Sequence, residues 1–265
     1  MKISNSTNWL KTGNTLSFIG VVAVNALANI LPINGQNTGA ISDSFPNLFV
    51  PAGITFAIWG VIYLLLAVFV LYQWGLIAKN SNQEEVVKAT GIFFMLSSVF
   101  NILWILSWHY NQVLLSVAVM LLLLGSLIVL SVKLEKLSYD RKSAFCAKAP
   151  VNVYLGWISV ATVANFVALF VHIGWNGFNI PQNFWTMIMV LIASLLALIG
   201  LRKYRNISYS LVTIWALAGI IIKHMTIYES QYLEIIICTG ISILLITICM
   251  LKQLFSAKKN TGFTE

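Results

Sequence analysis

Residues 112–132 read QVLLSVAVMLLLLGSLIVLSV, a continuous apolar run without a charged side chain. A helix needs about 20 such residues to cross the hydrocarbon core of a bilayer, where its backbone polar groups must be bonded within the segment. The run therefore predicts a transmembrane helix. A transmembrane β-barrel is excluded because apolar residues follow one another here instead of alternating with polar ones.

The rest of the chain repeats this pattern. Of its 265 residues, 59% are hydrophobic and only 9% are charged, whereas soluble domains carry about 25% charged residues. The mean hydropathy of +0.86 agrees. The sequence predicts an all-α, polytopic membrane helix bundle of about eight transmembrane helices. The expected spans are 15–32, 51–74, 91–109, 112–132, 150–172, 184–201, 207–225 and 232–251.

The basic residues support this number independently. In an eight-span chain, every one of the 16 Lys and Arg residues except Lys223 falls on one side of the membrane. Cytoplasmic loops are enriched in Lys and Arg, so both termini are expected in the cytoplasm, with the protein in the cell (plasma) membrane. The net charge of +8 sits in these loops and forms no basic helix face, which argues against a nucleic-acid partner.

The first apolar run has an alternative interpretation. Lys2 and Lys11, followed by apolar residues and Ala26-Leu27-Ala28, also fit a cleaved signal peptide. Cleavage there would leave about seven spans.

Tryptophan is placed in two ways. Trp9, Trp74, Trp108, Trp175 and Trp185 fall near the expected span ends, which is typical of an interfacial aromatic belt. Trp59, Trp104, Trp157 and Trp215 fall deeper. A deep indole N–H needs an acceptor, so we expect these four to face protein or a cavity.

Three spans carry aromatic and amide side chains on one helix face. The spacings of three and four residues keep each set on one side of its helix. The residues are Trp59 and Tyr63 in the second span, Asn101 and Trp104 in the third, and Tyr154, Trp157, Ala161 and Asn165 in the fifth. A single buried Asn can simply join two helices. Three such faces together predict an aromatic cavity with a few polar anchors.

These motifs resemble the TspO/MBR family, the translocator or tryptophan-rich sensory proteins. The matching motifs are W-x3-Y at Trp59 and Tyr63, F-N-x-x-W at Phe100, Asn101 and Trp104, and Y-L-x-W-x3-A-T-x2-N from Tyr154 to Asn165. The resemblance covers about residues 15–173, and it makes the first run a retained helix.

The resemblance implies a five-helix core that binds a bulky hydrophobic ligand, a porphyrin or haem-type tetrapyrrole or a sterol-like molecule. The residues that it places at the pocket are Trp59, Asn101, Trp157 and Ala161, to which we add Tyr63, Trp104, Tyr154 and Asn165. We therefore expect a core over residues 1–175 and three additional helices over 176–265.

The chain also departs from the family pattern. Residues 33–50, which would cover the ligand, contain Phe45 and Phe49 but no Trp. Residues 166–183 lack the basic segment that the family associates with sterols, while a pattern of that type occurs at 137–141.

Catalytic and metal signatures are scarce in the sequence. His109, His172 and His224 are expected at three span ends on one side, without ligand spacing. The three cysteines, Cys146, Cys238 and Cys249, form no CxxC pair. Lys223, His224, Glu229 and Glu234 gather near the last two spans, where Glu234 fits a helix start or, alternatively, a gated pathway.

Three functions fit this sequence. The first is a ligand-binding membrane sensor or carrier without an enzymatic role. The others are a secondary transporter of a small hydrophobic molecule and a membrane enzyme that modifies a tetrapyrrole or lipid. The expected partners are membrane lipid, the hydrophobic ligand and, because Gly156 and Ala161 would permit close helix packing, a second copy in a homodimer.

Overall fold

The computed structural model describes residues 5–78 and 83–261, with side chains from Thr7 to Ser256 outside that gap. Over these ranges the chain forms helices joined by turns and contains no β-strand. The long helices are α1 (Asn5–Ile30), α3 (Ile58–Gln73), α5 (Phe93–His109), α6 (Val113–Glu135), α7 (Arg141–His172), α8 (Gln182–Tyr204), α9 (Ile207–Thr226) and α10 (Leu233–Thr261). The short ones are η1 (Ile33–Gly35), α2 (Thr38–Asp43), η2 (Gly53–Ala57), α4 (Gln83–Thr90) and η3 (Gly177–Asn179).

The predicted membrane bundle is confirmed. Within the described ranges, 7 helical segments are long and apolar enough to cross a membrane, with η2 and α3 forming one of them. Helix α5 has 17 residues and is about 25 Å long, somewhat less than the hydrocarbon core. Helix α4 precedes α5 across a bend of 45°, and together they make up to 8 spans.

Helix α7 begins at Arg141, well before the expected start near Pro150. The reason is a strong helix cap at Asp140, whose Oδ1 accepts the Ser143 backbone N–H at 2.8 Å. Pro150 lies inside the helix, although proline removes one helical hydrogen bond. The cap and the packing of α7 against its neighbours therefore outweigh the local preference of proline for a helix start.

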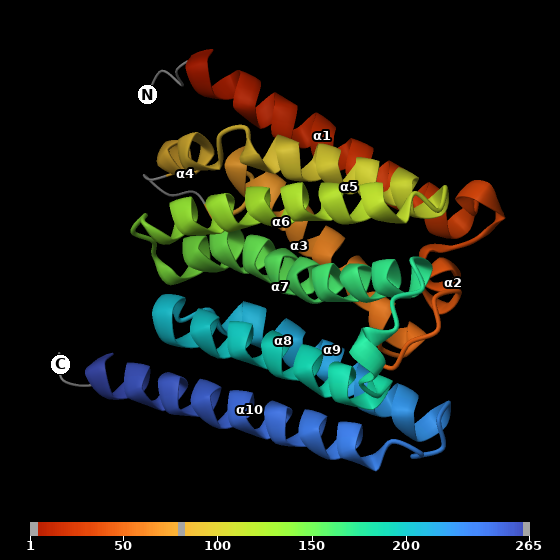
Figure 1. The fold of residues 1–265 in the computed structure, drawn as a ribbon. Coiled ribbons are helices and arrows are strands. Elements are labelled where there is room, and N and C mark those ends of the chain that lie inside the picture. The colour runs from red at the N-terminus through yellow and green to blue at the C-terminus, as the bar shows by residue number, and fades with distance from the viewer. Residues whose placement is uncertain (1–4, 79–82, 262–265) are drawn as a thin grey trace.

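The helices form two groups (Figure 1). In the first group α1 packs on α3 and α5, α5 on α6, and α6 on α7, while α3 packs on α7. In the second group α8, α9 and α10 pack on one another, and α9 joins the groups by packing on α7. The expected division near residue 175 falls in the connection between α7 and α8, and the division into a five-helix core and three additional helices stays a prediction.

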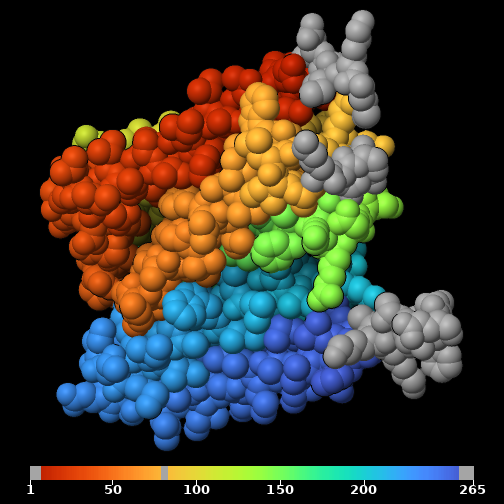
Figure 2. Space-filling view, turned by 180° about the vertical axis from the view of Figure 1, so that it is seen from behind, coloured from red at the N-terminus to blue at the C-terminus, as the bar shows by residue number. Residues whose placement is uncertain are grey.

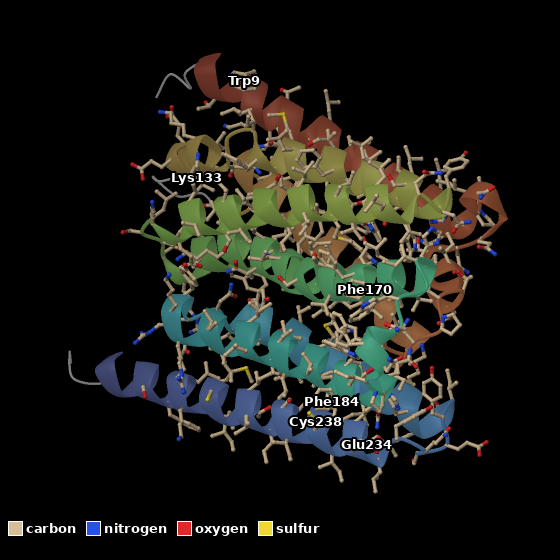
Figure 3. All side chains as sticks on the ribbon, viewed as in Figure 1. Trp9, Lys133, Phe170, Phe184, Glu234 and Cys238 are labelled. Atoms are coloured by element: carbon tan, nitrogen blue, oxygen red, sulfur yellow. The ribbon has the colours of Figure 1, made fainter. Side chains whose placement is uncertain are left out.

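The ends of the helices alternate between two sides. Helix α1 begins and α10 ends at the same end of the bundle (Figure 1). Lys133 lies at that end, and Glu234 lies toward the opposite end (Figure 3). We call these the basic end and the opposite end. Lys223, the exception to the charge pattern, lies at the opposite end and its Nζ is 3.7 Å from Asp43 Oδ1.

Helix α1 is joined to the bundle by buried polar contacts. Asn14 Nδ2 donates to Gln73 Oε1 at 2.8 Å, and Asn25 Nδ2 donates to Asn101 Oδ1 at 2.7 Å. Such contacts are expected of a permanent helix of the fold, which favours the retained helix over the signal-peptide interpretation.

Candidate ligand-binding site

The three predicted aromatic faces converge. Trp59 of α3 is at the centre, with its ring 5.6 Å from Tyr63, 6.4 Å from Trp104, 6.1 Å from Tyr154 and 6.2 Å from Trp157. These residues come from α3, α5 and α7. Helices with matching aromatic faces thus meet around one interior volume.

A cavity of about 40 Å³ adjoins this cluster. Five of the eight predicted residues line it, namely Trp59, Trp104, Trp157, Ala161 and Asn165. The other three, Tyr63, Asn101 and Tyr154, do not line it; the two tyrosines contact Trp59. The cavity holds only a few water molecules as it stands, so a bulky ligand needs it to widen.

Five buried polar groups around this cluster have no hydrogen-bond partner among the described residues. They are the hydroxyls of Tyr63 and Tyr154, Asn101 Nδ2, Trp104 Nε1 and Trp157 Nε1. An unpaired buried donor costs about 1–3 kcal/mol, so such groups are uncommon in a purely structural core. Every one of them can donate a hydrogen bond, which makes the cluster complementary to hydrogen-bond acceptors.

The two intramembrane asparagines have partners of different kinds. Asn101 Oδ1 accepts from Asn25 of α1 while its amide nitrogen stays unpaired. Asn165 exchanges hydrogen bonds with Ser116 of α6, at 3.2 and 3.3 Å. Asn165 therefore also joins two helices, whereas the amide nitrogen of Asn101 lies beside the Tyr154 hydroxyl without a hydrogen bond of normal geometry.

The cavity is closed by residues 31–57, which we call the cover segment. It contains η1, α2 and η2, and it contributes Thr38, Ser42, Val50, Pro51 and Phe56 to the cavity wall. In Figure 2 this red-to-orange stretch runs across to the blue helices. Its position explains why the cavity is small.

The end of α5 holds the first half of the cover segment. Trp108 Nε1 donates to the Thr38 carbonyl at 3.3 Å, and the ring nitrogens of His109 lie 3.1 Å from Thr38 Oγ1 and 3.0 Å from the Ile33 carbonyl. Asn34 Nδ2 donates to the His109 carbonyl at 2.9 Å. Polar contacts therefore fix a segment that has little regular structure of its own.

Helix α9 and the residues after it hold the second half. Ala52 N donates to the Gly219 carbonyl at 3.0 Å, and His224 Nε2 donates to the Leu48 carbonyl at 2.9 Å. The Tyr228 hydroxyl donates to the Asn47 carbonyl at 3.1 Å. A Cβ added at Gly219 would overlap the Thr55 hydroxyl and lie 2.9 Å from Pro51 Cβ, so glycine is needed for this close approach.

Two tryptophan predictions need correction. Trp108 is no belt residue, because it is 5% exposed and lines the cavity. Trp215, expected in the interior, is 43% exposed, and its indole donates to the Thr55 carbonyl at 2.9 Å. An acceptor from the cover segment therefore satisfies the N–H of Trp215 while its ring stays at the surface.

A second cavity, of about 230 Å³, lies at the opposite end between α7, α8 and the cover segment. Its wall includes Phe170, Trp175 and Trp185. The ring centroid of Trp175 lies 4.6 Å from that of Phe170 and 5.2 Å from that of Trp185. Phe170 is on the last turns of α7 (Figure 3). Apart from the two belt tryptophans, no pattern in the sequence predicts this cavity.

The three histidines lie apart from one another, each beside the cover segment. His109 and His224 bind its backbone carbonyls, and the ring of His172 lies 6.2 Å from that of Phe45. Among the described residues no group of three potential ligands is placed to hold a metal ion. The histidines therefore act as contacts to this segment.

Within the charged group predicted near the last two spans, His224 lies in electrostatic range of both Lys223 and Glu234. Lys223 faces Asp43, and Glu234 Oε1 accepts from Asn183 Nδ2 at 2.6 Å. Glu234 is in the first turn of α10, where a carboxylate is favourable.

Gly156 and Ala161 are used inside the molecule. A Cβ on Gly156 would lie 3.1 Å from the Tyr209 carbonyl of α9, and Ala161 lines the cavity. These two residues are therefore unavailable to a dimer interface, and a homodimer stays a prediction without them.

The sterol-like pattern at 137–141 forms the turn between α6 and α7. Lys148 Nζ lies 4.9 Å from the ring of Tyr139, and burial raises the pKa of that phenol. The Ser143 backbone N–H lowers the pKa of Asp140. Both residues thus have structural roles at this helix start.

The fold and site define a multi-pass helical membrane protein with an aromatic cavity enclosed by its helices. A model of the TSPO-like protein family matches residues 8–251, and the chain belongs to this family. The match includes α8, α9 and most of α10, beyond the part that the sequence motifs covered. No curated protein and no solved structure matches the chain.

Proposed function

We propose that this protein binds a bulky hydrophobic ligand of the tetrapyrrole or sterol-like type in the aromatic cavity around Trp59. Membership of the TSPO-like family supports a sensory or translocator-like membrane protein. The single observation that carries the proposal is the set of five unpaired buried donors beside this cavity.

The chemistry of these donors narrows the ligand class. Indole N–H, amide N–H and phenol O–H groups bind carbonyl, carboxylate or hydroxyl oxygens. The aromatic rings provide flat apolar contact surface. A flat ring system that carries oxygen acceptors matches both properties, and protoporphyrin, with its carboxylates, is the suitable first probe.

Binding requires the cover segment to move. A cavity of about 40 Å³ is far below the roughly 300–1,000 Å³ typical of sites for drug-sized ligands. The cover segment is held by hydrogen bonds to α5 and α9 and by the burial of Ile41, Leu48 and Phe49 in the core. Opening therefore requires part of this packing to separate, as local opening does at other ligand sites. We infer that the ligand replaces part of this segment's contact with the aromatic cluster.

The test is a titration of purified protein with protoporphyrin, followed by tryptophan fluorescence and by the porphyrin absorbance. We expect saturable binding that weakens about three- to tenfold in Trp157→Phe and in Asn101→Leu, since each loses one hydrogen bond to the ligand. Trp9→Phe is the matched control and should bind as the unmodified protein does, because Trp9 is exposed on α1 and lies outside the cavity.

Non-saturable quenching, or equal affinity in all four proteins, would reject the proposal. Folding of the variants is checked by thermal unfolding. Asn25 Nδ2 keeps its bond to the Val21 carbonyl in Asn101→Leu, so this variant is expected to remain folded.

A further inference from the structure

At the basic end, a wide cavity of about 710 Å³ opens between the start of α7 and the turn from α8 to α9. Its wall includes four cationic side chains, Lys148, Arg202, Lys203 and Arg205, and one acidic side chain, Glu135. Lys148 pairs with Glu135 at 2.9 Å. Neither arginine nor Lys203 forms an ion pair with any part of the chain that the structure describes.

The α8–α9 turn directs these charges. Arg205 adopts a left-handed conformation (φ 51°) that ends α8, and Asn206 caps α9 by accepting the Tyr209 backbone N–H at 3.0 Å. The first turn of α9, including Ser208, thus lies in the cavity wall. A helix N-terminus adds positive potential to the three unpaired cations.

A second, apolar groove of about 460 Å³ continues from this cavity. The two share Phe145, Ala149 and Ser208. The groove then runs between α3, α7 and α9, over Val61, Leu65, Val153, Leu211 and Trp215. The basic cavity and the groove therefore form one continuous surface, with cations at the end of the bundle and apolar side chains farther along the spans.

Two small side chains keep the groove connected to the basic cavity. Ala149 of α7 and Ser208 of α9 belong to both walls. Phe145 borders the junction and is 58% exposed. In Figure 2 the start of α7 (green) and the α8–α9 turn (cyan) come together at this end, beside the orange α3.

We propose that this composite surface is a binding site for an anionic phospholipid, with its phosphate in the basic cavity and one acyl chain in the groove. Basic pockets between helices at the cytoplasmic surface are suited to lipid phosphates. A free anion would use only the basic cavity, and a neutral lipid only the groove. The continuity of the two favours a single ligand that has both parts. This site is separate from the aromatic cavity, so the proposal does not depend on the ligand-binding function.

The test compares lipid retention by the full-length protein in native mass spectrometry, after reconstitution with equal amounts of phosphatidylglycerol and phosphatidylcholine. The unmodified protein should retain phosphatidylglycerol preferentially. The variant R202Q/K203Q/R205Q should lose at least about tenfold of that preference, since each cation near an anionic headgroup contributes up to about fivefold in affinity. Ala149→Leu should weaken retention without any change of charge, because the larger side chain fills the junction.

The matched control is K136Q/K142Q/K252Q, which removes three exposed cations from the basic end outside the cavity. It should keep the preference of the unmodified protein within about twofold. Equal retention of the two lipids, or an equal loss in the control and the cavity variant, would overturn the proposal. So would efficient displacement of phosphatidylglycerol by glycerol 3-phosphate, which would assign the cavity to a free phosphate.

Discussion

Asn101 shows how one side chain can serve both the fold and the site. Its carbonyl oxygen accepts from Asn25, which joins α5 to α1, while its amide nitrogen has no partner among the described residues. An intramembrane hydrogen bond of this kind is worth about 0.6 kcal/mol on average. The fold therefore depends weakly on Asn101, and a ligand that accepts from its amide should lose about three- to tenfold in affinity without it.

Asp140 allows a prediction for acid pH. The Ser143 backbone N–H lowers the pKa of its carboxyl group, so the cap favours the folded state above the ordinary carboxyl range and is lost as the pH falls through the lowered pKa. At each pH, the amide exchange rates of residues 141–144 are divided by those of Asp140→Asn. We expect this ratio to be larger at acid than at neutral pH. The asparagine keeps the cap without a charge to titrate. Equal pH dependence in the two proteins would contradict the assignment.

At the scale of the elements, the cover segment differs from the spans around it. Its helices are short, and both of its halves are attached to other elements through backbone carbonyls. Helix α9 approaches it closely only because residue 219 is glycine. The helices of the second group thus contribute directly to closing the cavity of the first.

Gly219→Ala tests this contact. The added methyl overlaps Thr55 and Pro51, so we expect a loss of roughly 1–3 kcal/mol in unfolding free energy. It is measured by thermal or denaturant unfolding in detergent. Gly240→Ala in α10 is the control, since nothing lies within 4 Å of its added Cβ. That change should be neutral or stabilise by up to about 1 kcal/mol, as alanine does in a helix. Similar destabilisation by both changes would argue against a specific contact at Gly219.

At the scale of the whole molecule, the charged residues are divided between the two ends of the bundle. Lys133 and the α8–α9 turn lie at the basic end, while the Lys223–Asp43 pair lies at the opposite end. This arrangement supports the proposal that both termini are cytoplasmic in the plasma membrane.

Cysteine labelling in intact cells tests the orientation. In a background that lacks the three native cysteines, a membrane-impermeant maleimide should label Tyr110→Cys and Ser230→Cys at the opposite end. It should label Lys136→Cys only after the cells are permeabilised. All three positions are exposed. The reverse pattern would invert the topology.

The sequence predicted the parts of this molecule that depend on local pattern. Apolar runs predicted the spans, and spacings of three and four residues placed Trp59, Trp104 and Trp157 at one cavity. The family resemblance predicted that residues 33–50 cover the ligand. The contacts that hold the cover segment could not be predicted, because it has no hydrophobic period and its partners lie far away in the chain, as Trp215 does from Thr55. The prediction that Trp108 belongs to the aromatic belt was wrong for the same reason, because its acceptor, the Thr38 carbonyl, belongs to that segment.

The anchoring of the cover segment by α9 has a consequence for biosynthesis. The bonds from His224 to Leu48 and from Tyr228 to Asn47 join residues 176 and 181 positions apart. A nascent chain emerges from its N-terminus, and contacts between distant residues form only after both have been made. The aromatic cluster is thus complete once α7 has been inserted, but its closure waits for the ribosome to pass residue 228. During that interval the second half of the cover segment lacks these two bonds, so it closes the cavity less firmly than in the finished chain.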